Sequence, residues 1–411
     1  MEEYETPAFR FKQKDYFLAS LGTKCYMPFL DTQIVEVRNR LSERTIREGL
    51  IATIHGKQAD RIPFQTRTNY LPQGRVEREV RNRGMGINYV VQCMHTFMPH
   101  VRVVTSTGMT TRRKETRTIF ETPVGKVSQV SRDAKPFAGR FDGIGGHLTE
   151  YPVKKLEDWD VVKYMAEDTQ YEPYYDRFDY FKKLLGDEGV IFTFVGYHSP
   201  YTKLLIEWAS AQRLYIDHFR HPEKVEAVLE AIGNNQEKQF PIAADSPADI
   251  VKYGDHIDEG FISPSAFEKY ILPIHNKFAR TAHAKAKITA IHCDGRLNGL
   301  KELIGELDHN IIHAITPPPV GNLPIKEALD IWDDKVLWIN YEYHFMGPRA
   351  LRKHMLKLLR SIVPGYRVVI DASTERWVPL DCLHMFANIM SKATLPLTER
   401  GIRKIEKSTS P

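Results

Sequence analysis

Hydrophobic residues along the second half of the chain gather in short, nearly continuous runs. From about residue 189, runs of five to seven apolar positions alternate with longer stretches whose apolar residues recur at helical spacing. Such runs are typical of strands buried on both faces of a parallel sheet. They are VIFTFVG (190–196), DIVKYGD (249–255), KITAIHCDG (287–295), NIIHAITPP (310–318), KVLWINYE (335–342) and RVVIDAS (367–373).

Helical patterns fill the intervals between these runs, for example in PEKVEAVLEAIGNNQEKQF (222–240) and PSAFEKYILPIHNKFARTAHAK (264–285). Strands that alternate with helices predict parallel βα units. Two earlier segments, RIPFQTR (61–67) and NYVVQCMH (88–95), bring the expected number of strands to about eight. We therefore predict an α/β fold of the (β/α)8 TIM-like barrel class. A doubly wound sheet is the alternative.

The first third is less regular. SERTIREGLIATIHGK (42–57) predicts an amphipathic helix that opens with Ser42. The Thr- and Val-rich segment 101–131 predicts antiparallel strands, with turns at Gly108 and at 123–125, and 152–165 predicts a helix that closes this part. We expect a single barrel domain over 1–411, with an N-terminal elaboration that contains antiparallel strands and an inserted α+β subdomain over 86–165.

Composition narrows the functional classes. The chain has 411 residues, 42% of them hydrophobic, and a net charge of +5 that is spread along the sequence, which gives nucleic-acid binding little support. Its 4 cysteines form no CxxC pair, so neither a disulfide framework nor a zinc finger is indicated. The charged N-terminus lacks the apolar core of a signal peptide, and no apolar run approaches the roughly 20 residues of a membrane span. We expect a cytoplasmic protein.

Candidate chemistry lies at the strand ends, because the active site of a βα barrel is built there. Ionisable and polar groups follow seven of the predicted strands, more than packing alone requires. These residues are Arg67, His198, Asp255, Asp258, Glu259, His292, Asp294, His313, Thr316, Tyr341, Glu342, Asp371 and Glu375.

The pair His292 and Asp294 predicts a metal site. Side chains alternate along a strand, so these two point to one side and Cys293 to the other. Imidazole nitrogen and carboxylate oxygen are zinc ligands, and a catalytic zinc normally has three protein ligands and one open position. We expect Glu342 as the third ligand, with Asp371 as the second choice. A hydrogen-bonded histidine beside an Asx turn is the simpler interpretation.

Three carboxylates, Asp255, Asp258 and Glu259, lie close together in GDHIDEGFISP (254–264). Like charges at this spacing repel one another unless a cation or a proton compensates. They are candidates for orienting a substrate or delivering a proton, and a solvated acidic loop is the alternative.

Five segments in succession resemble the uroporphyrinogen decarboxylase superfamily. They are GYHSPYTKLLIEW, HPEKVEAVLEAI, YGDHIDEGFISPSAFEKYILPIHNKF, KITAIHCDGRLNGL and ITPPPVGNLPIKEAL, with ETPVG and YPVKKLEDW before them. The resemblance covers roughly residues 40 to 400 and implies a distorted (β/α)8 barrel, which agrees with the strand count. It also makes a homodimer plausible.

The superfamily has two main branches, and the resemblance to each is partial. Decarboxylases hold substrate carboxylates with an arginine-rich stretch after the first strand; Arg67 matches its first arginine, but the following segment is shortened. Cobalamin-dependent methyltransferases that act on thiols bind zinc through a His-x-Cys pair and a later Cys. Here His292 matches, Asp294 takes the first Cys position, and Asp371 or Ser373 lies near the second.

This donor set favours an ether substrate. Imidazole and carboxylate leave zinc a harder Lewis acid than thiolates do, which suits an ether oxygen. We therefore predict the methyltransferase component of a corrinoid-dependent demethylase, moving a methyl group from a small donor, a methoxylated aromatic ether, to the cobalamin of a corrinoid partner protein. His292, Asp294 and Glu342 would bind the metal.

Five further residues are candidate substrate contacts: Arg67, Tyr197, His198, His313 and Tyr341. Two rival functions stay open. A decarboxylase would need no metal and would depend on Arg67, whereas a non-enzymatic tetrapyrrole or corrinoid-protein binder would show no turnover.

Overall fold

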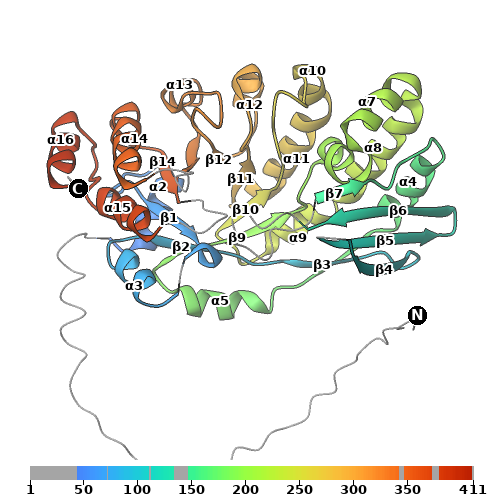
Figure 1. Ribbon diagram of the computed structural model, residues 1–411, viewed down its shortest axis with the longest axis horizontal. Helices are drawn as coiled ribbons and strands as arrows, with labels where there is room; N and C mark the ends of the chain where they lie inside the picture. The colour runs from blue at the N-terminus through green and yellow to red at the C-terminus, as the bar shows by residue number, and fades with distance from the viewer. Residues whose placement is uncertain are drawn as a thin grey trace, which may run out of the picture. The chain divides into compact units, whose positions relative to one another are not determined.

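Eight parallel strands close into a barrel in the order β1-β14-β13-β12-β11-β10-β9-β2 (Figure 1). The computed structural model describes residues 44–71, 73–110, 113–133, 147–341, 347–372 and 379–409. All of them belong to one compact unit, Glu43–Pro411. Closure of the sheet confirms the predicted TIM-like barrel and excludes an open doubly wound sheet.

The barrel strands coincide with the predicted apolar runs. They are β1 (Phe64–Arg67), β2 (Gly86–Val90), β9 (Gly189–Val195), β10 (Ile250–Tyr253), β11 (Ile288–His292), β12 (Ile311–Ile315), β13 (Val336–Asn340) and β14 (Val368–Asp371). The segment 88–95 divides between β2 and the next strand, β3 (Met94–Phe97), because Val91 to Cys93 join no sheet.

Helices surround the strands, as the alternating pattern predicts (Figure 1). Between β9 and β12 these are α6 (Pro200–Lys203), α7 (Ser210–Arg220), α8 (Pro222–Gln236), α9 (Gln239–Asp245), α10 (Pro264–Ala266), α11 (Leu272–His283) and α12 (Lys301–Gly305). Beyond β12 follow α13 (Ile325–Ile331), α14 (Pro348–Ser361), α15 (Leu380–Met390) and α16 (Glu399–Ser408). Before β9 lie α2 (Ile46–Ile54), α3 (Arg75–Arg81), α4 (Asp158–Asp168) and α5 (Arg177–Leu185).

The described residues form two apolar cores, one inside the barrel and one between the strands and the surrounding helices. Alternate residues of the strands, such as Phe192, Ala290 and Trp338, pack together inside the barrel with Leu50 and Ile54 of α2. The residues between them pack outward against the helices in a larger core. Because α2 covers this inner cluster, the polar residues at the carboxyl ends of the strands are left for the opposite mouth.

Helix α2 starts later than predicted. Thr45, not Ser42, is its N-cap residue: the Thr45 hydroxyl accepts a hydrogen bond from Glu48 N, and the Glu48 carboxylate accepts one from Thr45 N at 2.8 Å. This reciprocal capping box satisfies two backbone donors and sets the start of the helix. Ser42 lies outside the described residues.

The predicted antiparallel strands form a four-stranded sheet that packs against α4 (Figure 1). Its strands are β4 (Arg102–Met109), β5 (Lys114–Thr122), β6 (Gly125–Arg132) and β7 (His147–Glu150), and a separate pair joins β3 (Met94–Phe97) to β8 (Gln170–Pro173). The turn between β5 and β6 is where it was predicted. The prediction of a turn at Gly108 is wrong, because Gly108 pairs with Glu115 inside the β4–β5 ladder.

The helix predicted over 152–165 also starts later, at Asp158. Asp158 Oδ2 accepts hydrogen bonds from the backbone N–H of Lys154 and Lys155 at 2.8 and 3.0 Å, which holds the preceding residues in a turn.

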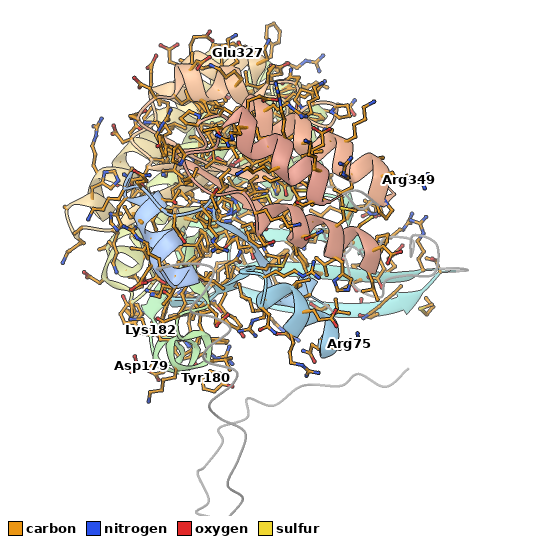
Figure 2. All side chains as sticks on the ribbon, turned by 90° about the vertical axis from the view of Figure 1, so that its left-hand side faces the viewer. Arg75, Asp179, Tyr180, Lys182, Glu327 and Arg349 are labelled. Carbon is orange, nitrogen blue, oxygen red and sulfur yellow. The ribbon has the colours of Figure 1, made fainter. Side chains whose placement is uncertain are left out.

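The outer helices carry solvated polar side chains. Figure 2 shows Asp179, Tyr180 and Lys182 on α5 and Arg75 on α3 at the edge of the molecule. None of the helices in the described ranges is long and apolar enough to cross a membrane.

Candidate metal centre

The end of β11 places His292 and Asp294 on one side of the chain, as predicted. His292 Nε2 lies 3.3 Å from Asp294 Oδ2. Cys293 points the other way and is fully buried in the outer core, where burial raises the pKa of its thiol well above the ordinary value. Cys293 is therefore a core residue in this fold.

The neighbouring loop supplies a third donor that the sequence analysis missed. His256 follows β10, which pairs with β11, and His256 Nδ1 lies 3.3 Å from Asp294 Oδ1. One ligand atom from each of His256, His292 and Asp294 lies within 4.8 Å of the others, so the three residues can hold a metal ion. Two imidazoles, a carboxylate and one open position form a donor set of the catalytic zinc type.

A signal for His256 was present in the sequence. It lies in GDHIDEG, directly after the predicted strand next to the one that ends at His292. The prediction named the carboxylates of this segment and not His256. One-dimensional spacing does not show which side chain of a loop turns toward a neighbouring strand.

Protonation states at the cluster suit a cation. Burial lowers the pKa of His292 to about 4, although the hydrogen bond with Asp294 acts in the opposite direction. Burial alone would raise the pKa of Asp294, but hydrogen bonds with His256 and His292 hold it well below the ordinary value. His292 is then a neutral imidazole and Asp294 a carboxylate at neutral pH, as metal ligation requires.

His313, a predicted substrate contact, lies next to His292 on the neighbouring strand. The two Nδ1 atoms are 3.1 Å apart, and the residues pair across β11 and β12. Burial lowers the pKa of His313 well below the ordinary value. A neutral His313 can accept the Nδ1–H of His292, which leaves His292 Nε2 to face Asp294 and the cluster.

His198 lies behind His256, with the two rings 5.2 Å apart. His198 Nδ1 is 2.6 Å from Glu207 Oε1, and Lys203 Nζ donates to Glu207 Oε2 at 2.5 Å. His198 Nε2 is buried and has no hydrogen-bond partner among the described residues. The ring is thus held in place by Glu207, next to the ligand cluster.

Close packing of two loops brings the ligands together. A Cβ atom added to Gly295 would lie 2.3 Å from the carbonyl oxygen of Ile257, and one added to Gly254 would lie 2.7 Å from that of Tyr197. Only glycine permits such approaches. The loops that carry His256 and Asp294 therefore touch through backbone at Gly295.

The three carboxylates proposed for catalysis form hydrogen bonds elsewhere. Asp258 accepts from the Arg296 guanidinium at 2.8 Å, and Glu259 accepts from Asn322 at 2.7 Å and from Gly299 N. Asp255 is fully buried and lies 3.1 Å from His275 Nε2. In this arrangement the carboxylates fasten the loops around the cluster, and their proposed catalytic roles stay predictions.

The other predicted residues spread over several places. Tyr341 is buried outside the barrel, where its hydroxyl lies 2.8 Å from His354 Nδ1. Tyr197 is 68% exposed and stacks on Phe194 at 5.4 Å. Asp371 is buried inside the barrel, where its Oδ2 accepts from Trp338 and Gln65 at 3.1 and 3.0 Å. Glu342 and Glu375 lie outside the described residues.

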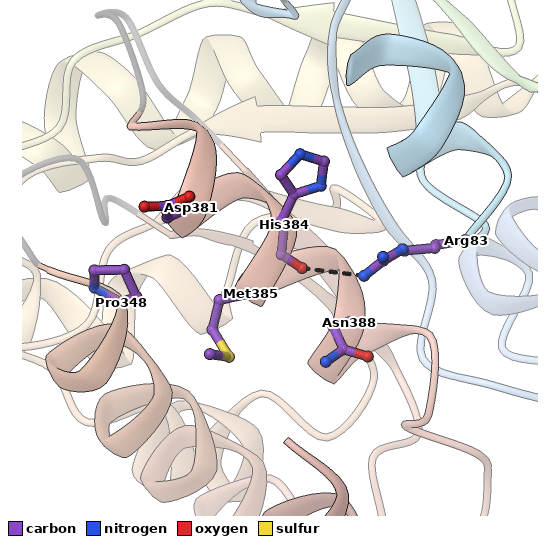
Figure 3. A pocket seen from close by; sticks show the side chains of 6 residues that line it. All are labelled: Arg83, Pro348, Asp381, His384, Met385 and Asn388. Carbon is purple, nitrogen blue, oxygen red and sulfur yellow. Dashed lines mark hydrogen bonds between the residues drawn. The ribbon is translucent and has the colours of Figure 1, made fainter. Parts of the chain in front are cut away.

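A cavity elsewhere lies between α3, α14 and α15, lined by Arg83, Pro348, Asp381, His384, Met385 and Asn388 (Figure 3). Arg83 donates across it to the His384 carbonyl at 3.5 Å. It contains none of the candidate site residues.

Comparison with known proteins finds a matching family model and similar solved structures. A search of curated proteins finds no match. Among solved structures, a methyltransferase from Methanosarcina mazei is similar with a TM-score of 0.49 and 13% identity, over 84% of this chain and 97% of that chain. The family model of uroporphyrinogen decarboxylase (URO-D) matches residues 141–315. Over these residues the chain matches the uroporphyrinogen decarboxylase family, as its sequence motifs predicted.

Proposed function

We propose that the protein is the methyltransferase component of a corrinoid-dependent demethylase. It would move a methyl group from a methoxylated aromatic ether to the cob(I)alamin of a corrinoid partner protein. The observation that carries the proposal is the His256, His292 and Asp294 cluster at the carboxyl-terminal mouth of a URO-D-like barrel. That mouth is where βα barrels perform their chemistry.

The donor set fits zinc and favours an oxygen substrate. Two imidazoles and one carboxylate would leave an open position, and Cys293 points away from them. A zinc ion held there would supply Lewis-acid polarisation to a bound ether oxygen. Without thiolate ligands the ion stays hard, which suits an ether better than a thiol.

The residues of the chain would position and orient the reactants. His313 fixes the ring of His292, and the contact at Gly295 fixes the distance between the two ligand loops. The cobalamin of the partner protein would supply the nucleophile for the methyl carbon, and the electron pair of the carbon–oxygen bond would stay on the phenolate oxygen. The corrinoid protein would approach the open mouth of the barrel.

Decarboxylation is a second candidate function, favoured by two cations inside the barrel. Arg67 ends β1 on the same side as Gln65, and Lys252 of β10 is buried at 2% exposure. Fixed cations of this kind can hold substrate carboxylates. This alternative expects turnover without a metal and a strict dependence on Arg67.

The test combines metal content with methyl transfer. Wild type, His292→Ala and, as a control, His221→Ala on the surface would be purified and analysed for zinc. Cob(I)alamin absorbance would then be followed after addition of a methoxylated phenol. The proposal expects near-stoichiometric zinc and methylcobalamin formation in wild type and His221→Ala, and loss of both in His292→Ala.

Equal zinc and equal transfer in His292→Ala would reject the site. Lack of both metal and transfer in wild type would favour a decarboxylase or a binding protein. The decarboxylase would then be tested through Arg67→Gln.

A further inference from the structure

A lysine lies inside the barrel that the proposed metal site does not use. Lys252 is the third residue of β10, and the alternation that points Ile250 into the inner core points Lys252 inward as well. Its side chain is 2% exposed. Within the described part of the chain, no hydrogen bond or ion pair of the Lys252 ammonium is found, although a buried charge normally has both.

Aromatic rings line the space around this lysine. Lys252 Nζ lies 4.3 Å from the centre of the Phe194 ring and 5.5 Å from that of Phe192. Phe192 in turn packs edge-on against Trp338 at 5.3 Å. Cation–π contacts stabilise an ammonium without neutralising its charge. The surroundings of Lys252 therefore suit a flat aromatic ligand that carries a negative group.

The nearby carboxylates do not neutralise Lys252. Asp371 and Asp294 both attract it electrostatically, but neither is within ion-pair distance. Asp294 is hydrogen-bonded to His256 and His292, and Asp371 Oδ2 accepts from Trp338 and Gln65. Among the residues that the structure describes, Asp371 Oδ1 has no hydrogen-bond partner. An anionic oxygen would supply a partner for the ammonium.

The charge of the region points the same way. Burial and the nearby Arg67 keep the pKa of Lys252 well below the ordinary value, because both disfavour the charged ammonium. An anion bound beside Lys252 would stabilise the ammonium.

Register places Lys252 beneath the metal cluster. Lys252 pairs with Ala290, two residues before His292 on the neighbouring strand. Two residues of a strand correspond to about 7 Å, the scale of one substituted benzene ring. A ring between the two levels could place a methoxy group at the metal and an opposite substituent at Lys252.

We infer that Lys252 binds the negatively charged end of the substrate, and that the methyl donor is an aromatic carboxylate of the methoxybenzoate class. This inference rests on the proposed function for the position of the methoxy group. The ammonium donates to a carboxylate oxygen, the rings of Phe192 and Phe194 flank the aromatic ring, and the methyl group points to the mouth, where the corrinoid protein docks.

Binding of two matched ligands tests the inference without catalysis. The dissociation constants of 4-methoxybenzoate and of its neutral isostere, 4-methoxybenzamide, would be measured by calorimetry on wild type, Lys252→Met and Lys335→Met. Lys335 is a suitable control because it is also buried, at 4% exposure, and its Nζ donates to Asp334.

Wild type and Lys335→Met are expected to bind the acid about tenfold or more tightly than the amide, as a charge-assisted hydrogen bond implies. In Lys252→Met this preference should fall to within about twofold, with the affinity for the amide retained. Equal binding of acid and amide by wild type, or an undiminished preference in Lys252→Met, overturns the inference. Equal binding of the two ligands by wild type would overturn the inference even if Lys252→Met does not fold.

Failure of the proposed function and failure of the Lys252 inference would give different experimental results. If wild type transfers methyl groups from neutral methoxybenzenes with no preference for the acid, the carboxylate subsite is wrong and the methyltransferase stands. If wild type prefers the acid in binding but never methylates cob(I)alamin, the methyltransferase is wrong and Lys252 still binds an anion.

Discussion

His292 Nδ1 lies 3.1 Å from His313 Nδ1, so the second histidine orients the first. An outer partner of this kind fixes the tautomer and the ring angle of a metal ligand, and its loss typically costs 10- to 100-fold in metal affinity. We expect His313→Phe to weaken zinc binding by about that factor, without the complete loss expected for His292→Ala. Competition with a fluorescent chelator measures the affinity, and unchanged binding in His313→Phe would contradict the role.

The sequence and the structure indicate different residues as the third metal ligand. The sequence favours Glu342, whereas the structure brings His256 to Asp294. We expect His256→Ala to lose most of the bound zinc and Glu342→Gln to keep it, because a catalytic site needs three protein ligands. Zinc per chain after dialysis measures this, and the reverse result would restore Glu342.

Gly295 sets the distance between the ligand loops. A methyl group at this position would meet the Ile257 carbonyl oxygen at 2.3 Å, so Gly295→Ala should push the His256 loop away from Asp294. A shift of this kind should lower zinc affinity at least about tenfold, the scale of a disturbed ligand shell. Gly49→Ala in α2 is the matched control, because no atom lies within 4 Å of the added Cβ. Equal zinc affinity in both variants would show that the loops can adjust.

Burial of Lys252 should lower the free energy of unfolding of the protein. A buried ammonium with no hydrogen bond is unfavourable, and methionine fills a similar volume without a charge. We expect Lys252→Met to raise the free energy of unfolding by about 1–3 kcal/mol. Lys335→Met should give no such gain, because it removes an ion pair. Urea unfolding measures both variants, and a less stable Lys252→Met would imply a hidden partner for this lysine.

Glu207 should make stability depend on pH in the acidic range. Burial alone would raise its pKa, but Lys203 and His198 lower it to about 2 from an ordinary value of 4.5. A carboxylate with a lowered folded-state pKa stabilises fully above the unfolded value, and this contribution is lost as pH falls from 4.5 toward 2.

Replacement of the carboxylate tests this dependence. Glu207→Gln should therefore cost about 1–2 kcal/mol at pH 7, allowing for solvent screening, and clearly less at about pH 3.5. Urea unfolding at the two pH values measures the difference. Glu223→Gln, whose side chain is 71% exposed, should show little effect at either pH. A constant difference between wild type and Glu207→Gln would contradict the assigned pKa.

Much of the fold was predictable because local chemistry decides it. Strands such as Ile311–Ile315 are buried on both faces, so their continuous apolar runs are readable in one dimension. Errors occurred where a nearby residue offered a competing contact. Thr45 completes a capping box with Glu48, and Gly108 continues a ladder in which its partner is Glu115.

Prediction of the candidate site was less complete. The alternation along β11 indicated that His292 and Asp294 share a side and that Cys293 does not. Spacing could not show that Asp258 turns to Arg296, or that Tyr341 packs toward α14. Loop residues take their direction from contacts with other loops, and those contacts join segments far apart in the sequence.

By itself the sequence determined the barrel, its eight strand positions and the pairing of His292 with Asp294, because periodicity and strand alternation are local properties of the chain. Tertiary structure alone decided that His256 joins them, that His313 lies next to His292 and that Lys252 lies buried one level below. Each of these relationships joins two strands or loops. They exist only once hydrogen bonding between neighbouring strands has fixed the register of the closed barrel.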